Sequence, residues 1–274
     1  MAHLQAKKSL GQHFLHDEKT LRDIAEAARI PEDEIVIEIG PGTGNLTRRL
    51  LKQRLSKLIA FELDDRAIEV LKTDLPDPRL EVVHQDFMSV VLNTFLEGHE
   101  KLTIVGNIPY YITSPIIFKL LNERSCIRSA TLLVQLEVAE RLAGVPRTKA
   151  YGIPSVISQC FAHVEMLFKV KAAAFRPPPR VESAVVRLDF ENNYFHRSGA
   201  QPPPNFDEKR FSTLVRTLFA MRRKMIRNNL KQLQDIHFSE VEPSIAGFLT
   251  KRAEELSVAD FLELYGLLYG VSQS

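Results

Sequence analysis

The chain has 274 residues, of which 45% are hydrophobic and 26% charged, and its formal net charge is +2. This balance excludes a disordered or fibrous protein, and the length suffices for one large core with a smaller accessory domain. The sequence shows neither a run of 18 apolar residues nor a signal peptide, so we expect no membrane association. The two cysteines, Cys126 and Cys160, lack metal-type spacing and favour free thiols, which predicts a cytoplasmic protein without a metal site.

Strand and helix patterns alternate through the first part of the chain. Apolar runs predict strands over residues 34–40, 57–63, 80–86, 101–107, 130–136, 164–170 and 181–190. Segments with a helical period predict helices over residues 17–29, 45–53, 66–75, 114–122, 137–144 and 153–162. Repeated β–α units imply a parallel sheet covered by helices on both faces. The last two strands have no helix between them, so we expect them to pair as a hairpin.

A polar segment separates this α/β region from a helical one. The sequence ENNYFHRSGAQPPPN, residues 191–205, contains three consecutive prolines and is typical of a linker. We therefore predict an α/β domain over residues 1–192, a linker over 193–205 and a small all-α domain over 206–274.

The start of the helical region carries a basic face. Between Lys209 and Lys231 the chain has eight Lys or Arg residues and no Asp or Glu, with apolar residues recurring on the opposite side. Clustered positive charge points to a polyanionic partner, and nucleic acid is favoured over a merely solvated helix face. Candidate phosphate contacts are Lys209, Arg216, Arg222, Arg223, Lys224 and Arg227. Two more helices are predicted near residues 243–253 and 257–269.

A glycine-rich turn follows the first long strand. In the segment EIGPGTGNLT the strand ends at Gly40, and Gly42 and Gly44 precede a helix, which lets the backbone approach a ligand closely. Glu62 ends the next strand, where a carboxylate can accept both hydroxyls of a ribose. Dinucleotide-binding turns carry a third glycine at the position of Asn45, so the pattern favours S-adenosylmethionine over a dinucleotide.

Asp86 follows the third strand, in the segment HQDF. Its carboxylate can accept a hydrogen bond from the exocyclic amine of an adenine, or it can cap a short helix. The glycines, Glu62 and Asp86 all follow successive strands, at the sheet edge where open α/β folds bind ligands. We therefore interpret them together as a cofactor site.

The segment TIVGNIPYYIT ends the fourth long strand with an amide, a proline and two tyrosines. Asn107 lies at the same sheet edge, and its side-chain oxygen can accept a hydrogen bond from the weakly nucleophilic amine of an adenine. Pro109 stiffens the turn, and Tyr110 can stack on an extruded base. We interpret these three residues as catalytic, against the simpler alternative of a turn with aromatic packing.

These motifs resemble those of the small-subunit (16S) ribosomal RNA adenine N6,N6-dimethyltransferase family, over most of the chain. KKSLGQHFL resembles the family's N-terminal cofactor motif, which implies cofactor contacts for His13, where many members have asparagine, and for Leu15. NIPY resembles the family's catalytic motif, which implies that Asn107 touches both cofactor and target base. FRPPPRVESAVV resembles the segment with a second aromatic, which implies that Phe175 sandwiches the target adenine. From the residues alone, a core phenylalanine is the simpler interpretation of Phe175.

The resemblance implies a Rossmann-like class I S-adenosylmethionine-dependent methyltransferase domain with a small C-terminal all-α domain. It implies an enzyme that transfers methyl groups from S-adenosylmethionine to N6 of adenines in small-subunit rRNA, giving N6,N6-dimethyladenosine within a pre-30S ribosomal subunit. We expect a monomer. Two alternatives stay open: a large-subunit rRNA adenine methylase of the macrolide-resistance type, and a ribosome-assembly factor that acts mainly by binding. The segment LVRTLFAMRRKMIRNNL resembles the bacterial small-subunit enzymes and favours them.

Overall fold

The chain folds into two compact units. The computed structural model describes residues 4–7, 11–233, 236 and 241–270. The first unit comprises residues 1–139 and 164–191, and the second comprises residues 140–163 and 192–274. The first unit ends one residue before the predicted domain boundary at residue 192. Residues 140–163, predicted to lie in the α/β domain, instead belong to the second unit, because helix α6 (Ile153–Phe161) packs against helix α8 (Glu208–Ala220).

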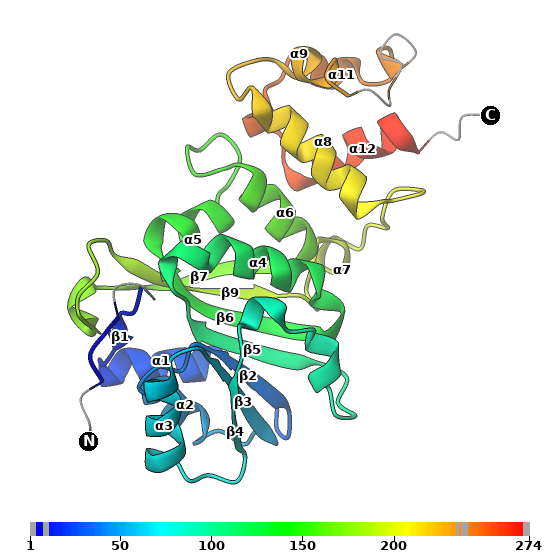
Figure 1. Cartoon of the computed structure of the whole chain (residues 1–274). Helices are drawn as coiled ribbons and strands as arrows, with labels where there is room; N and C mark the ends of the chain where they lie inside the picture. The colour runs from blue at the N-terminus through cyan, green and yellow to red at the C-terminus, as the bar shows by residue number, and fades with distance from the viewer. Residues whose placement is uncertain (1–3, 8–10, 234–235, 237–240, 271–274) are drawn as a thin grey trace. The chain divides into compact units, whose positions relative to one another are not determined.

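A seven-stranded sheet forms the centre of the first unit (Figure 1). Its strands are β2 (Ile35–Ile39), β3 (Lys57–Glu62), β4 (Leu80–His84), β5 (Leu102–Asn107), β6 (Ile127–Gln135), β7 (His163–Val170) and β9 (Ser183–Asp189). Their order is β4-β3-β2-β5-β6-β9-β7. The strands β4, β3, β2, β5 and β6 are parallel to one another. Strand β9 is antiparallel to β6. This arrangement confirms the predicted α/β class, and β7 lies beside β9 as the missing helix led us to expect.

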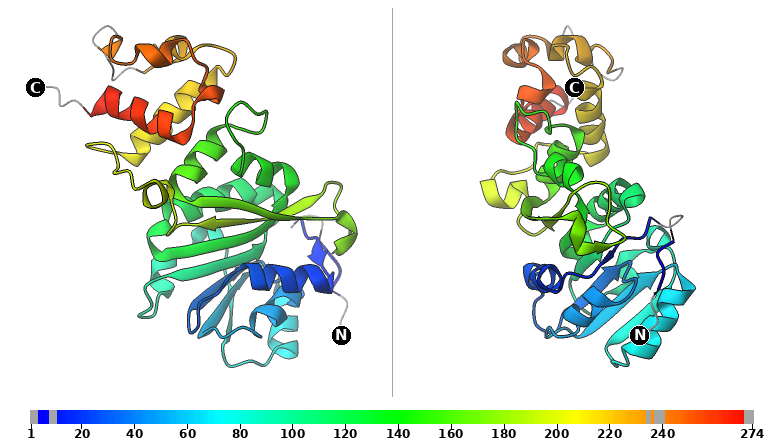
Figure 2. Two further views of the ribbon diagram at one scale, coloured as in Figure 1. Left: turned by 180° about the vertical axis from the view of Figure 1, so that it is seen from behind. Right: turned by 90° about the vertical axis from the view of Figure 1, so that its left-hand side faces the viewer.

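Helices cover both faces of this sheet. The helices of this region are α1 (Glu18–Ala27), α2 (Asn45–Leu50), α3 (Asp65–Asp74), α4 (Thr113–Asn122) and α5 (Leu136–Leu142). Leu21 of α1 and Leu46 of α2 share one buried cluster with Val105 of β5, so these two helices cover one face. Helix α4 lies on the opposite face, as the two views of Figure 2 show. The carboxyl ends of the parallel strands are thereby left as the accessible edge, which is where the predicted site residues lie.

Short elements add to this frame. The 3-10 turns are η2 (Phe87–Ser89), η3 (Leu92–Phe95), η4 (Tyr110–Ile112), η5 (Arg124–Cys126), η6 (Ala172–Ala174) and η7 (Ala253–Glu255). Strands β1 (Phe14–Leu15) and β8 (Phe175–Arg176) pair antiparallel as a separate two-stranded sheet. Two residues are too few to give a strand pattern, so the sequence did not predict this pairing. It brings the N-terminal motif to the proline-rich loop.

The second unit is built from helices around an aromatic core. Its helices are α6 (Ile153–Phe161), α7 (Tyr194–Ser198), α8 (Glu208–Ala220), α9 (Ile226–Leu230), α11 (Ala246–Leu249) and α12 (Val258–Tyr269). The rings of Phe206, Phe211 and Tyr265 lie within 6.0 Å of one another, centroid to centroid. Helix α7 forms inside the predicted linker, where Asn193 caps it. None of the helices within the described ranges has the length and hydropathy needed to cross a bilayer.

The predicted amphipathic stretch over residues 209–231 is not one helix. Helix α8 ends at Ala220, and α9 begins only at Ile226. In between, the Arg222 guanidinium donates to Glu254, at 2.6 Å, and to the carbonyls of Thr148 and Lys149. These tertiary contacts hold residues 221–225 in a non-helical conformation. Sequence periodicity cannot predict them, because the partners lie far away in the sequence.

Candidate active site

A pocket opens at the carboxyl edge of the sheet. Nine of the eleven predicted cofactor and catalytic positions line it: His13, Leu15, Gly40, Gly42, Glu62, Asp86, Asn107, Pro109 and Tyr110. Residues from β2, β3, β5 and the N-terminal segment thus meet around one cavity, although they are spread over nearly 100 positions of the chain. Within the described residues, no group of three or more His, Cys, Asp or Glu side chains comes together as metal ligands.

The glycine turn forms the wall of this pocket. Gly42 has a φ of +54°, and a Cβ atom there would come within 2.9 Å of the Phe14 ring, so the position excludes larger residues. Gly44 has a different function. It precedes α2 in a left-handed conformation, and a Cβ atom would meet Leu71 and Leu75 of the α3 region. Gly44 does not line the pocket, so the structure assigns it to helix packing rather than to the cofactor contact that we predicted.

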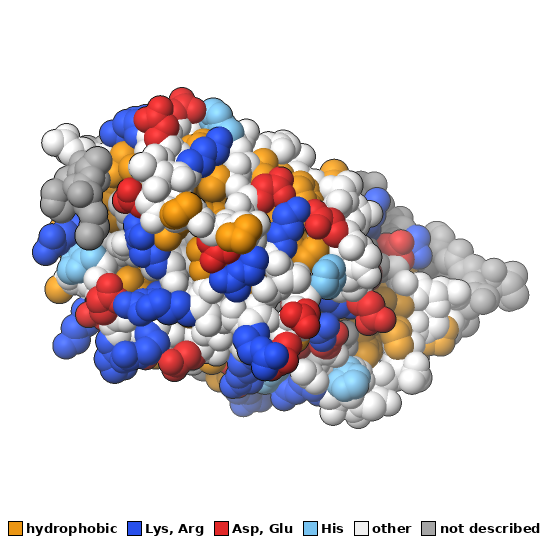
Figure 3. All heavy atoms as spheres, turned by 90° about the horizontal axis from the view of Figure 1, so that it is seen from below, with side chains coloured by type: hydrophobic (Ala, Val, Ile, Leu, Met, Phe, Trp, Pro, Cys, Tyr) orange, Lys and Arg blue, Asp and Glu red, His pale blue; other side chains and the backbone are white. Residues whose placement is uncertain are grey.

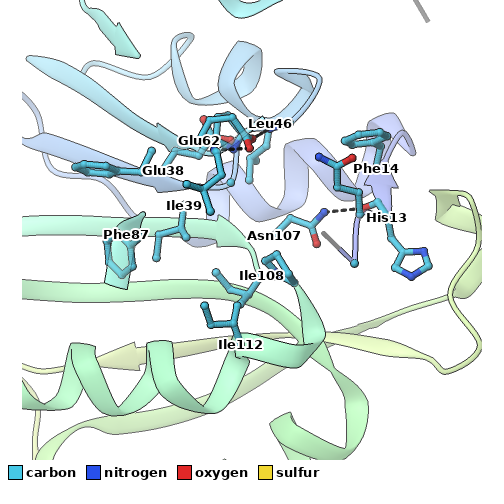
Figure 4. Close-up of a pocket in the computed structure, with 18 of the residues that line it drawn as sticks. His13, Phe14, Glu38, Ile39, Leu46, Glu62, Phe87, Asn107, Ile108 and Ile112 are labelled. Atoms are coloured by element: carbon cyan, nitrogen blue, oxygen red, sulfur yellow. Dashed lines mark hydrogen bonds between the residues drawn. The ribbon is translucent and has the colours of Figure 1, made fainter. Parts of the chain in front are cut away.

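Glu62 joins the end of β3 to the glycine turn. Its residue is 8% exposed, and its Oε2 atom accepts from the backbone N–H of Gly42 at 2.9 Å. Its Oε1 atom accepts from the backbone N–H groups of Leu63 and Asp64. The carboxylate is therefore held in one orientation at the pocket wall (Figure 4). The Oε1 atom thus uses both of its lone pairs, whereas Oε2 uses one and keeps acceptor capacity for a ligand hydroxyl.

Asp86 caps a short turn and also lies in the pocket lining. Its Oδ1 atom accepts from the backbone N–H of Met88 at 2.9 Å and caps turn η2. The same exposed side chain lines the pocket beside Phe87. A cap holds the carboxylate in place, so capping supports ligand binding here rather than excluding it.

The Asn107 amide is oriented by the N-terminal segment. Its Nδ2 atom donates to the backbone carbonyl of His13 at 2.9 Å, which directs the amide oxygen away from that segment (Figure 4). The Pro109 carbonyl already accepts from the Ile112 N–H and from the Thr113 hydroxyl. Asn107 therefore presents an acceptor at the pocket, whereas Pro109 mainly shapes the turn.

Tyr110 is half-buried in the pocket lining. Its hydroxyl lies 2.6 Å from Ser183 Oγ, and burial raises the pKa of the phenol, so the group stays neutral. Its ring stacks on the imidazole of His13, with centroids 5.7 Å apart and planes inclined by 24°. The His13 Nδ1 atom lies 2.8 Å from the Pro177 carbonyl. The His13 ring thus points away from Asn107, and it is the main chain of His13 that holds the Asn107 amide (Figure 4).

Phe175 does not lie where the resemblance implied. It is 2% exposed, pairs with Leu15 across β1 and β8, and belongs to the buried core. It is absent from the pocket lining, although this lining includes its neighbour Leu15. The structure therefore agrees with the simpler interpretation of a core residue.

Sequence reasoning missed a buried acid in the pocket lining. Glu38 is 1% exposed, and within the described residues its Oε2 atom has no hydrogen-bond partner. Burial raises the pKa of this carboxyl from 4.5 to about 8, and the charge of Glu62 acts in the same direction. The sequence did carry a signal for this buried acid, because Glu38 is an acidic residue on an otherwise apolar strand, directly before the glycine turn.

The predicted phosphate contacts of the helical unit separate into groups. Lys209, Arg223 and Lys224 are exposed, whereas Arg222 uses its guanidinium inside the unit and Arg227 pairs with Glu242. Arg216 is exposed on helix α8. Figure 3 shows a face of the first unit instead, where Lys and Arg side chains are interspersed with Asp and Glu.

The comparisons with known proteins decide the family. A family model described as ribosomal RNA adenine dimethylase matches residues 3–268. The chain belongs to this family. It is 41% identical to the ribosomal RNA small subunit methyltransferase A of Ligilactobacillus salivarius, over 95% of this chain and 89% of that protein. It is 43% identical to the protein of the same name from Chlorobaculum parvum, over 96% and 89%.

Solved structures of related enzymes share the fold. A dimethyladenosine transferase from Plasmodium falciparum superposes with a TM-score of 0.78 at 28% identity, covering 92% of this chain and 96% of its own. The 23S rRNA methyltransferase ErmE superposes with a TM-score of 0.70 at 29% identity, covering 93% and 99%. As a member of the ribosomal RNA adenine dimethylase family, the protein is an S-adenosylmethionine-dependent methyltransferase.

The pocket fits this cofactor chemically. S-adenosylmethionine is a cation with a ribose and an adenine, and the pocket offers the acids Glu62 and Asp86. A Cβ atom at Gly40 would meet only the Asn107 carbonyl oxygen, 3.8 Å away, so the wall there admits a ligand close to the backbone. Phe87 supplies an apolar surface for a flat ring.

Proposed function

We propose that the protein transfers methyl groups from S-adenosylmethionine to N6 of adenines in small-subunit rRNA, giving N6,N6-dimethyladenosine. The single observation that carries this proposal is that the Asn107–Tyr110 turn and the cofactor acids line one pocket. The relatives at 41% and 43% identity, which are named as small-subunit methyltransferases, favour the small subunit over the large one.

In this proposal the cofactor residues divide by position. Glu62 accepts a ribose hydroxyl at Oε2, Asp86 accepts from the adenine amine, and the turn at Gly40 and Gly42 borders the methionine end. The main chain at His13 and the side chain of Leu15 close the site from the N-terminal side. When bound, the cofactor supplies an activated methyl group.

The target amine is held by the turn that follows strand β5, residues 107–110. We assign the two acceptors for its N–H bonds to the Asn107 side-chain oxygen and the Ile108 carbonyl, because the Pro109 carbonyl is already engaged. Accepting both bonds favours a tetrahedral nitrogen, whose lone pair then points at the methyl group. Tyr110 stacks on the extruded base. The neutral phenol takes no proton, so the proton of the methylated amine leaves to solvent afterwards.

The helical unit is proposed to bind rRNA phosphates through Lys209, Arg216, Arg223 and Lys224. Binding through phosphate contacts should weaken steeply with salt. Arg222 and Arg227 support this surface through their ion pairs with Glu254 and Glu242. We further propose that the protein acts as a cytoplasmic monomer on a pre-30S subunit.

The test is tritiated methyl transfer to undermethylated small subunits, followed by nucleoside analysis, with large subunits in parallel. We expect N6,N6-dimethyladenosine in small-subunit rRNA only, and its loss in Asn107→Ala. Label in large-subunit rRNA alone would establish the macrolide-resistance type of activity instead. An Asn107→Ala protein that transfers no methyl group yet fully restores subunit assembly would show that binding is the main role.

A further inference from the structure

The N-terminal segment crosses the cofactor pocket and is fixed at two strand ends. Residues 11–15 all line the pocket. On one side this segment reaches Asn107 at the end of β5, through the His13 carbonyl. On the other side it reaches Asp64, two residues after β3 ends, through Gln12. It therefore spans the pocket between the cofactor acid Glu62 and the catalytic turn.

Asp64 is the buried acceptor of this segment. Its side chain is fully buried, its Oδ1 atom accepts from Lys7 Nζ at 3.1 Å, and its Oδ2 atom accepts from Gln12 Nε2 at 3.1 Å. The backbone N–H of Lys7 also donates to Gln12 Oε1 at 2.8 Å. The Arg66 guanidinium, and then Gln12 and Lys7, hold the pKa of the Asp64 carboxyl well below its usual range.

Capping alone does not account for these contacts. Asp64 caps α3 by accepting from the Arg66 N–H at 3.3 Å, and it also pairs with the Arg66 side chain. A helix cap needs only the local acceptor. Lys7 and Gln12 come from 57 and 52 residues away and contribute nothing to that cap.

Tyr111 closes the segment from the catalytic side. Gly11 has a φ of +58°, and a Cβ atom there would lie 3.1 Å from the Tyr111 ring. The ring thus packs over a glycine, which explains why the catalytic turn carries a second tyrosine although that residue is 64% exposed.

We propose that Asp64 is a positioning residue: it latches residues 11–15 over the bound cofactor and thereby fixes the Asn107 amide for the target amine. The proposal rests on the proposed methyl transfer. With the latch closed, the cofactor cannot leave past the segment, and the His13 carbonyl stays in place for Asn107 Nδ2. With the latch open, the cofactor dissociates faster and the Asn107 amide is free to rotate.

The test uses variants that keep the Asp64 cap. Lys7→Met removes a donor that does not line the pocket, and Gln12→Glu keeps the side-chain shape but places a carboxylate against Asp64. Lys19→Met is the matched control, because Lys19 makes an exposed ion pair with Asp23 on α1, away from the segment. The full-length proteins are compared by calorimetry, cofactor dissociation rate, kcat at saturating cofactor and thermal melting.

We expect Lys7→Met to raise the cofactor Kd about threefold and Gln12→Glu about tenfold, through faster dissociation. We expect kcat at saturating cofactor to fall about tenfold in Gln12→Glu, which a purely structural contact would not cause. Lys7→Arg should behave like the wild type. Kd and kcat within twofold of the wild type in both Lys7→Met and Gln12→Glu would overturn the latch. A wild-type protein that binds no S-adenosylmethionine would instead overturn the proposed function.

Discussion

Replacing Glu38 with glutamine should stabilise the protein in mildly alkaline solution and have little effect in mild acid. The folded protein holds the Glu38 proton with a pKa of about 8, against 4.5 as the ordinary value, because the carboxyl is buried. Folding therefore takes up a proton between these two pH values, and stability falls as the pH rises through that window. A pKa raised from 4.5 to about 8 lowers the free energy of unfolding by at most about 5 kcal/mol above pH 8.

The assay is urea unfolding of the wild type and Glu38→Gln at about pH 5.5 and about pH 8.5. We expect the difference in free energy of unfolding to grow by about 3 kcal/mol in favour of the variant between these two values. A difference that is the same at both pH values would refute the reasoning, because it would show that Glu38 does not change its proton affinity on folding.

Glu34 provides the matched control, because it is a second buried acid beside the same strand. It is 5% exposed, but it accepts from the Thr103 hydroxyl at 2.5 Å and from Arg128 Nε at 2.6 Å. Glu34→Gln removes the charge that the guanidinium faces, so it should lower the free energy of unfolding by about 2 to 3 kcal/mol at neutral pH. Glu38→Gln and Glu34→Gln make the same chemical change, but in mildly alkaline solution the first should raise the free energy of unfolding and the second should lower it.

Three further predictions address the sites. Glu62→Gln should weaken S-adenosylmethionine binding about tenfold in calorimetry, because an amide cannot accept at both oxygens as the carboxylate does; unchanged affinity would remove Glu62 from the site. Tyr110→Ala should lower kcat about tenfold at saturating cofactor and leave the cofactor Kd within about twofold, because the ring contacts the base; a changed Kd alone would contradict this. Arg222→Ala should lower the free energy of unfolding by about 2 kcal/mol, whereas Arg223→Ala should spare stability and reduce the salt slope of rRNA binding by about one.

The second unit combines two separate stretches of the chain, and this shows how tertiary contacts alter a domain boundary that is predicted from sequence. The first unit ends at residue 191, at the start of the polar, proline-rich segment. The same segment gives no hint that residues 140–163 also belong to the second unit. That assignment follows from buried contacts such as the hydrogen bond from the Tyr151 hydroxyl to the Leu256 carbonyl, across 105 residues.

The sequence by itself determined the strands and the residue types at their ends. Apolar runs and helical periods are local properties, so β2 to β5 were predicted to within two residues at each end and β6 to within three. Because parallel strands end at one edge, Glu62, Asp86 and Asn107 were expected to meet, and they do line one pocket.

Only the tertiary structure decided how the side chains at that edge are used. Gly44 packs a helix, Phe175 is buried in the core and Arg222 is bound within the helical unit, although each stands in a motif that suggested contact with a ligand. The same holds for the orientation of the Asn107 amide, which is set by a carbonyl 94 residues earlier. The physical reason is common to all four: burial and hydrogen-bond partners depend on residues distant in the chain, and a sequence pattern records only near neighbours.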